Sequence, residues 1–159
     1  MLVCGIDPGA NGAIAVLDSE SPDSVELLDL KKHTIYEVFD WMEGKISSFS
    51  PGEIWIEDIH SMYGMSAKSN FGFGRNLGIV TAISQIATPG VIAKTVTPKI
   101  WQKYIGVTAK GKAIKKQVAE IATKLYPRAS IYGKRGGLLD GRSDALMIAH
   151  YGLNYKEPV

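Results

Sequence analysis

The feature that most constrains this chain is its first eighteen residues, where two short apolar runs flank a turn. The first run is Met1–Asp7, which ends on a carboxylate, and Pro8–Gly12 separates it from the second, Ala13–Leu17. Apolar runs broken by Gly, Pro and Asn are typical of strands joined by a tight turn. The segment predicts a β-hairpin with Asp7 ending its first strand. A charge there is costly to desolvate without a partner, and we expect a metal ion to be that partner.

Length and composition favour one domain over residues 1–159. The chain is 45% hydrophobic and 21% charged, which is ordinary for a globular protein. No apolar run reaches the roughly 18 residues of a membrane-spanning helix, and no signal peptide is visible, so no membrane partner is expected. The single cysteine, Cys4, cannot form an internal disulfide. It lies in the first apolar run, so we expect a buried thiol and a reducing, intracellular compartment.

A third strand and a helix complete the first half of the chain. Val25–Leu30 reads as a strand after a loop over 19–24, and such short connections predict three antiparallel strands. Apolar residues then recur at three and four positions over 34–49, which indicates an amphipathic helix. Thr34 and Glu37 have the spacing of a capping box at its start.

A second strand that ends in acid follows this helix, over Glu53–Asp58. A strand after a helix usually returns parallel to the first one, which would bring Glu57 beside Asp7. Binding groups of α/β sheets gather at such carboxyl ends. On position alone, two acids solvated at a strand end is the better interpretation of Glu57 and Asp58.

Residues 59–76 mix aromatic residues, Met, Gly and Ser. This composition suits a mobile loop that stacks on bases, with Met62 and Tyr63 as the better candidates for touching a ligand. Phe71 is a further candidate, although it and Phe73 are equally suited to pack beneath a helix N-terminus. A helix over 76–87 is expected next, followed by a short strand over 91–93 with an extension to Val96.

Positive charge is concentrated between residues 94 and 135. This stretch holds eleven Lys and Arg residues and one acid, Glu120, although the whole chain has a net charge of only +2. Such an excess indicates a polyanionic partner, and a solvated lysine-rich face is the alternative. We expect one helix after Thr97-Pro98 and a basic helix over 112–126. The residues expected to track a phosphate backbone are Lys110, Lys112, Lys115, Lys116, Lys134 and Arg135.

Two acids open the last predicted helix. Asp140 and Asp144 are four residues apart, so they share a helix face. Asp140 has an equally good interpretation as an N-cap. Asp144 stands against the apolar run Ala145–Ala149, which makes a purely solvated acid a weaker explanation there.

This order of elements and acids resembles the ribonuclease H-like superfamily, and within it the RuvC-type Holliday junction resolvases, including phage-borne and divergent members. Several stretches carry the resemblance: Gly5-Ile6-Asp7-Pro8-Gly9, Ile56-Glu57-Asp58-Ile59-His60-Ser61-Met62, Phe71-Gly72-Phe73-Gly74, Thr97-Pro98-Lys99-Ile100-Trp101 and Ser143-Asp144-Ala145-Leu146-Met147-Ile148-Ala149. It implies an α/β fold with a mixed five-stranded sheet, three strands antiparallel and then two parallel, flanked by helices. It also implies a bacterial or phage-infected cytoplasm.

The resemblance further implies a nuclease site. Asp7, Glu57 and Asp144 match the family's metal-binding acids, and Asp140 substitutes for a fourth acid because Gly141 stands at the usual position. Four carboxylates suit two Mg²⁺ ions, or Mn²⁺, roughly 3.5–4 Å apart, which activate water and stabilise the leaving oxygen. A basic residue is expected nearby, from Lys112, Lys115 or Lys116, and Lys115 is our choice for the catalytic set.

The implied function is a homodimer that resolves four-way DNA junctions by paired nicks, with its dimer face on the helix over 76–87. Two other hypotheses stay open on the same fold: a nuclease for RNA or RNA–DNA hybrid, and a non-catalytic junction- or RNA-binding module. The Asp-Pro-Gly-x-x-Gly turn also resembles the phosphate loop of actin-like ATPases and sugar kinases, which usually need a longer chain.

Overall fold

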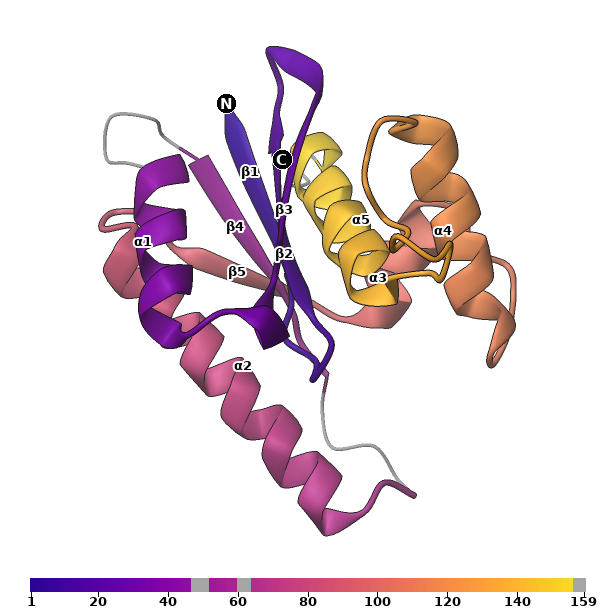
Figure 1. Cartoon of the computed structure of the whole chain (residues 1–159), viewed down its shortest axis with the longest axis horizontal. Coiled ribbons are helices and arrows are strands. Elements are labelled where there is room, and N and C mark those ends of the chain that lie inside the picture. The colour runs from indigo at the N-terminus through magenta and orange to yellow at the C-terminus, as the bar shows by residue number, and fades with distance from the viewer. Residues whose placement is uncertain (47–51, 60–63, 156–159) are drawn as a thin grey trace.

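The computed structural model describes residues 1–46, 52–59 and 64–155. Its centre is a five-stranded sheet in the order β3-β2-β1-β4-β5 (Figure 1). The strands are β1 Leu2–Asp7, β2 Ala13–Asp18, β3 Ser21–Asp29, β4 Gly52–Glu57 and β5 Ala93–Val96. The first three pair antiparallel, and β4 and β5 join β1 in parallel. The predicted mixed sheet is confirmed.

Helices cover both faces of this sheet (Figure 1). They are α1 Ile35–Lys45 and α2 Ala67–Ala87 on one face, and α3 Pro98–Tyr104, α4 Ala113–Leu125 and α5 Asp140–Asn154 on the other, with a 3₁₀ turn at Leu30–Lys32. In the part of the chain that the structure describes, no helix is both long and apolar enough to cross a membrane.

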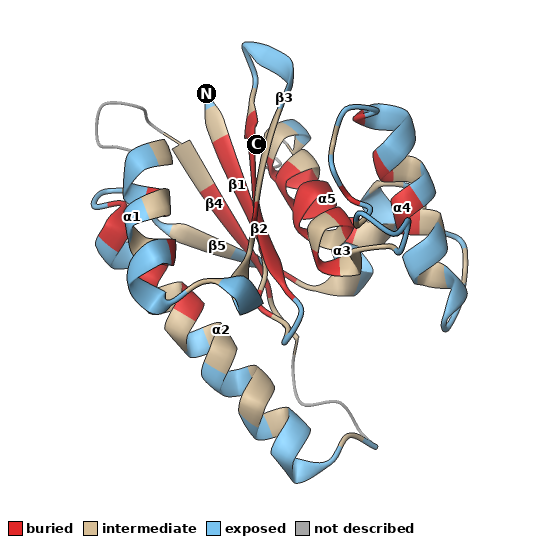
Figure 2. Cartoon of the chain, in the orientation of Figure 1, coloured by how far each residue is buried: buried red, intermediate tan, exposed pale blue. Residues whose placement is uncertain are grey.

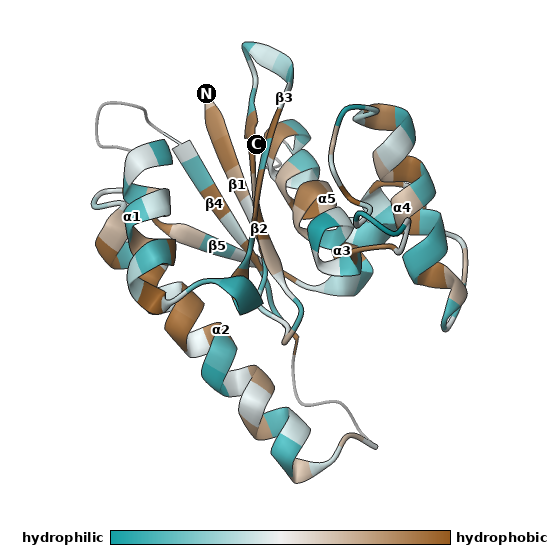
Figure 3. Cartoon of the chain, in the orientation of Figure 1, coloured by the Kyte–Doolittle hydropathy of each residue, from teal (hydrophilic) through white to brown (hydrophobic). Residues whose placement is uncertain are grey.

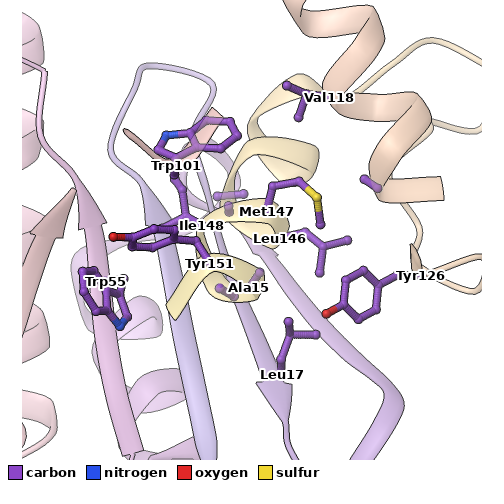
Figure 4. Close-up of a cluster of buried hydrophobic side chains, with 14 of the residues drawn as sticks. Ala15, Leu17, Trp55, Trp101, Val118, Tyr126, Leu146, Met147, Ile148 and Tyr151 are labelled. Carbon is purple, nitrogen blue, oxygen red and sulfur yellow. The ribbon is translucent and has the colours of Figure 1, made fainter. Parts of the chain in front are cut away.

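The core has two layers because successive strand residues face opposite sides of the sheet. On β2, Ile14 and Val16 pack toward α1 and α2, whereas Ala13, Ala15 and Leu17 pack toward α5. Figure 2 shows the buried residues concentrated in these strands and in α5, and Figure 3 shows hydrophobic residues along the same strands. Figure 4 shows side chains of the second layer, including Trp101 and three consecutive residues of α5.

Helix α5 lies directly against β1 and β4. A Cβ atom at Gly5 would fall 2.2 Å from the backbone nitrogen of Ala149 and 2.3 Å from the carbonyl oxygen of Ala145. A Cβ atom at Gly152 would fall 2.2 Å from the ring of Trp55. Since no side chain fits in these gaps, the helix is held in register with both strands by close approach of its backbone.

Several predicted boundaries were wrong. Strand β3 begins at Ser21, four residues before Val25. Its polar first residues extend the hairpin by backbone pairing of Ser21 with Asp18, beyond an irregularity in the register between Leu17 and Asp18. Strand β5 is Ala93–Val96, so the predicted extension to Val96 is present, and Val91 and Ile92 lie before the strand. Helix α1 ends at Lys45, and residues 47–49 of its predicted C-terminus lie outside the described residues.

The largest difference concerns residues 67–75, predicted as a loop. They form the first turns of α2, which Ser66 caps by accepting a hydrogen bond from the Ser69 backbone N–H. The glycines there cost a helix about 1 kcal/mol each, and this cost does not prevent α2 from starting at Ala67. The capping box at Thr34 and Glu37 was predicted and is present.

Candidate active site

Two carboxylates lie side by side where β1 and β4 end. The parallel register pairs Ile6 with Ile56, so Asp7 and Glu57 are the next residues along their strands. Both side chains face α5, because Gly5 and Trp55, two residues earlier on each strand, contact that helix. Asp58 follows the last residue of β4, and continued alternation would turn it to the opposite face of the sheet.

Helix α5 adds Asp144 from its second turn and Asp140 from its first residue. The charges of Asp7, Glu57 and Asp140 all act on the carboxylate of Asp144, which places the four acids in one electrostatic neighbourhood. Leu139, and not Asp140, is the N-cap of α5, so the capping interpretation of Asp140 was wrong. The sequence-predicted acids therefore come together from three separate elements.

Steric exclusion at Gly141 explains why the acid on the first turn of α5 is Asp140 and not the next residue. A Cβ atom at Gly141 would lie 1.9 Å from the carbonyl oxygen of Asn11, in the turn between β1 and β2. No side chain can stand there while α5 keeps its place. An acid on this turn of the helix must occupy another position, and Asp140 is the adjacent residue.

Burial and mutual repulsion disfavour the charged forms of these acids. Burial, and after it the charge of Asp7, raise the pKa of Glu57 to about 7, against the hydrogen bond from Trp101, which lowers it. Burial also raises the pKa of Asp144 well above its ordinary value, and the charges of Asp7, Glu57 and Asp140 add to that rise. The pKa of Asp7 is raised by burial, against a hydrogen bond from the Gly9 N–H. The site holds more negative charge than its surroundings compensate.

Lys115 is the cation that reaches this cluster. Its ammonium group donates to Asp140 Oδ2 across the gap between α4 and α5. That bond, together with the charges of Asp140, Asp144 and Asp7, raises the pKa of Lys115, so it stays protonated at neutral pH. Lys116, in contrast, lies 4.0 Å from Glu120 on the outer face of α4. Of the three candidate lysines, the structure places Lys115 at the acids.

The other predicted nucleic-acid-binding residues are exposed around α4. Lys110 and Lys112 lie in the loop that precedes this helix, and Lys134 and Arg135 lie in the loop between α4 and α5. Gln117 orders the first loop by accepting the backbone N–H groups of Thr108 and Ala109 at 2.9 and 2.7 Å.

The predicted aromatic and Met contacts are only partly described. Phe71 lies in the part of α2 that projects beyond the ends of β1 and β4 (Figure 1), and its side chain is 76% exposed. The alternative in which Phe71 packs beneath a helix was therefore wrong. Met62 and Tyr63 lie outside the described residues.

Two supporting contacts were not predicted. Trp101, which is fully buried, donates its indole N–H to Glu57 Oε1 at 2.9 Å. Arg142 holds Asp29 with two hydrogen bonds of 2.6 and 2.8 Å and donates a third to the Ser130 carbonyl, which ties the start of α5 to the end of β3. Each contact joins positions far apart in the sequence, and no local pattern signals either one.

The donor chemistry of the site suits a divalent cation. Clustered carboxylates with raised pKa values and one lysine leave excess negative charge, and carboxylate oxygens are the ligands that Mg²⁺ and Mn²⁺ prefer. Across residues 1–46, 52–59 and 64–155, however, no three His, Cys, Asp or Glu side chains are already gathered as one metal-binding group. The four acids interact electrostatically, but they do not form a complete metal-binding geometry.

Comparison with known proteins supports the fold. No protein-family model matches the chain, and no curated protein does. The structure of Thermus thermophilus RuvC in complex with a Holliday junction substrate is similar, with a TM-score of 0.61 and 19% sequence identity over 94% of this chain and 90% of that one. A second structure of Thermus thermophilus RuvC gives a TM-score of 0.55 and 19% identity over 96% and 95%.

Proposed function

Because the chain has a ribonuclease H-like fold similar to that of RuvC, we propose that it is a divalent-metal-dependent endonuclease that resolves four-way DNA junctions by paired nicks. The observation that carries this proposal is the assembly of Asp7, Glu57 and Asp144 at one sheet edge, from three elements, with Lys115 beside them. Buried like charges are costly, so their convergence needs a functional reason.

In this proposal Asp7, Glu57 and Asp144, with Asp140, hold two Mg²⁺ or Mn²⁺ ions. Bound ions would lower the pKa of a coordinated water and stabilise the charge of the leaving oxygen. The chain's own residues would orient the metal ions and neutralise the charge of the phosphodiester. The carboxylates provide hard oxygen ligands, and Lys115, held by Asp140, places a permanent positive charge where a phosphodiester would sit.

The basic surface of α4 and its flanking loops supports DNA as the partner. Five exposed basic residues there could contact phosphates: Lys110, Lys112, Lys116, Lys134 and Arg135. Phe71, on the projecting end of α2, is a candidate for stacking on an unpaired base, together with Met62 and Tyr63.

We further propose that two copies act together. A four-way junction presents two equivalent strands, and a two-fold dimer would place one acid cluster at each of them. Helix α2 is the proposed dimer face, since it carries exposed apolar side chains such as Ile86, which is 67% exposed.

A cleavage assay tests the proposal. A labelled four-way junction, a linear duplex and an RNA–DNA hybrid are incubated with Mg²⁺, Mn²⁺ or EDTA. We expect paired symmetrical nicks in the junction alone, lost in EDTA. Asp7→Ala, Glu57→Ala and Asp144→Ala should each abolish cutting and keep junction binding within a few fold. Asp40→Asn, an exposed acid on α1 across the sheet, is the matched control and should cut normally.

Other outcomes would change the assignment. Normal cutting by the three acid variants would contradict the site. Cutting of the hybrid alone would indicate a ribonuclease H-type activity, and metal-independent binding without any cutting would make the chain a junction-binding module.

A further inference from the structure

A buried tryptophan contacts one of the candidate metal ligands from outside the acid cluster. Trp101 is fully buried, Glu57 is 5% exposed, and the indole Nε1–H donates to Glu57 Oε1 at 2.9 Å. An indole N–H can only donate a hydrogen bond. The contact therefore fixes one carboxylate oxygen as an acceptor in a region from which water is excluded.

The fold brings Trp101 to this position by a short route. Val96, the last residue of β5, pairs in register with Glu57, and α3 starts two residues later at Pro98. Trp101 then lies one turn into α3, over the end of β4. Its ring belongs to the cluster that includes Val118 of α4 and Ile148 of α5 (Figure 4), so it cannot turn away without opening the core.

We infer that Trp101 is a positioning residue for metal binding: its indole N–H holds Glu57 by Oε1 and would leave the other oxygen, Oε2, for a cation that Glu57 would hold with Asp7 and Asp144. This inference rests on the proposed metal-dependent function. A carboxylate with a free rotamer would lose conformational freedom on binding an ion, and a pre-oriented one does not. Partners of this kind typically change metal affinity by roughly 10–100-fold when removed.

The chain provides a matched control on the same strand. Trp55 is also buried, at 5% exposure, and its Nε1–H donates to Glu53 Oε2 at 2.9 Å. Trp55→Phe and Trp101→Phe therefore remove the same atoms and the same kind of hydrogen bond from the core. Only Trp101→Phe changes the partner of a residue in the acid cluster.

Titration calorimetry with Mn²⁺ alone, on the full chain, tests the inference. Wild type should bind Mn²⁺, and Glu57→Gln should bind it much more weakly or not at all. We expect Trp101→Phe to weaken binding tenfold or more and Trp55→Phe to leave it within twofold, at comparable melting temperatures. Equal affinity of Trp101→Phe and wild type would overturn the inference. So would an equal loss in both Phe variants, because general loosening of the core would explain it.

A measurement on the wild-type protein avoids dependence on the Phe variants. In a ¹⁵N-labelled sample the indole N–H signal of Trp101 should move as Mg²⁺ is added, and that of Trp55 should not. An unmoved Trp101 signal at saturating Mg²⁺ would overturn the inference. If Mn²⁺ and Mg²⁺ give the expected pattern but junctions are not cut, the positioning role stands and the proposed nuclease function fails. If no binding depends on Glu57, both fail.

Discussion

Replacing Glu57 by glutamine should stabilise the metal-free protein at alkaline pH. The pKa of Glu57 is about 7 in the folded chain, against an ordinary value of 4.5. Between these values the folded state keeps a proton that the unfolded state has released, so the free energy of unfolding falls as pH rises. At about 1.36 kcal/mol per pKa unit, the ionised carboxylate costs about 3 kcal/mol above pH 7 and nothing below pH 4.5.

Glutamine has no charge to desolvate, and its amide oxygen still accepts the indole N–H of Trp101. We therefore expect Glu57→Gln to exceed wild type by about 3 kcal/mol at pH 8 and to match it near pH 4.5. For a chain of this length, the difference corresponds to a melting temperature higher by roughly 6–12 °C. Thermal melts in EDTA over this pH range measure it.

Glu53→Gln is the control for this experiment. Glu53 lies on the same strand and also accepts an indole N–H, from Trp55, but it pairs with Lys94, so its replacement removes a favourable ion pair and should not stabilise. Added Mg²⁺ should stabilise wild type and leave Glu57→Gln nearly unchanged, because a ligand stabilises only the state that binds it. A Glu57→Gln variant no more stable than wild type at pH 8 in EDTA would refute the electrostatic description of the site.

Three further predictions concern the frame around the acids. Gly141→Ala should lose roughly 3 kcal/mol or more by urea unfolding, because its Cβ would meet Asn11 O, whereas Gly44→Ala, with nothing within 4 Å on exposed α1, should gain up to about 1 kcal/mol. Asp29→Asn should lose about 2 kcal/mol at pH 7. The Arg142 bond holds the pKa of Asp29 well below its ordinary 3.8, so this deficit should shrink as pH falls below that value; a deficit that persists in acid would contradict the pairing. The double variant Lys115→Ala and Lys116→Ala should weaken junction binding and reduce the slope of log affinity against log salt by about 2, measured by fluorescence anisotropy, with Lys45→Ala on α1 as the unaffected control.

The sheet and the acid cluster were accessible from the sequence because both depend on local periodicity. Strand alternation sets the face of Asp7, and a strand after a helix returns parallel, which brings Glu57 alongside. The spacing of Asp140 and Asp144 gave their common helix face. These inferences need only patterns of a few residues and general rules of chain topology, whereas the choice of Glu57 over Asp58 and the grouping of the acids as one set came from the resemblance to RuvC-type resolvases.

Other parts of the site depend on contacts that no local pattern reports. The choice of Lys115 depends on how α4 is rotated toward α5, which the packing of Val118 and Ala122 in the core decides. Trp101 and Glu57 are 44 positions apart, and Arg142 and Asp29 are 113 apart. The early start of α2 was missed because Gly72 and Gly74 weaken the helical signal over residues 67–75.

The packing of α5 on β1 also has a consequence for how the protein is made. Strand β1 lies in the middle of the sheet, and α5, the helix that covers its Gly5, follows all five strands in the sequence. Until α5 has been synthesised, Asp7 and Glu57 lack Asp144 and the second layer of the core lacks its largest contributor. A nascent or truncated chain would therefore carry half of an acid cluster on an open sheet, so the complete cluster would arise only in chains whose synthesis has reached α5.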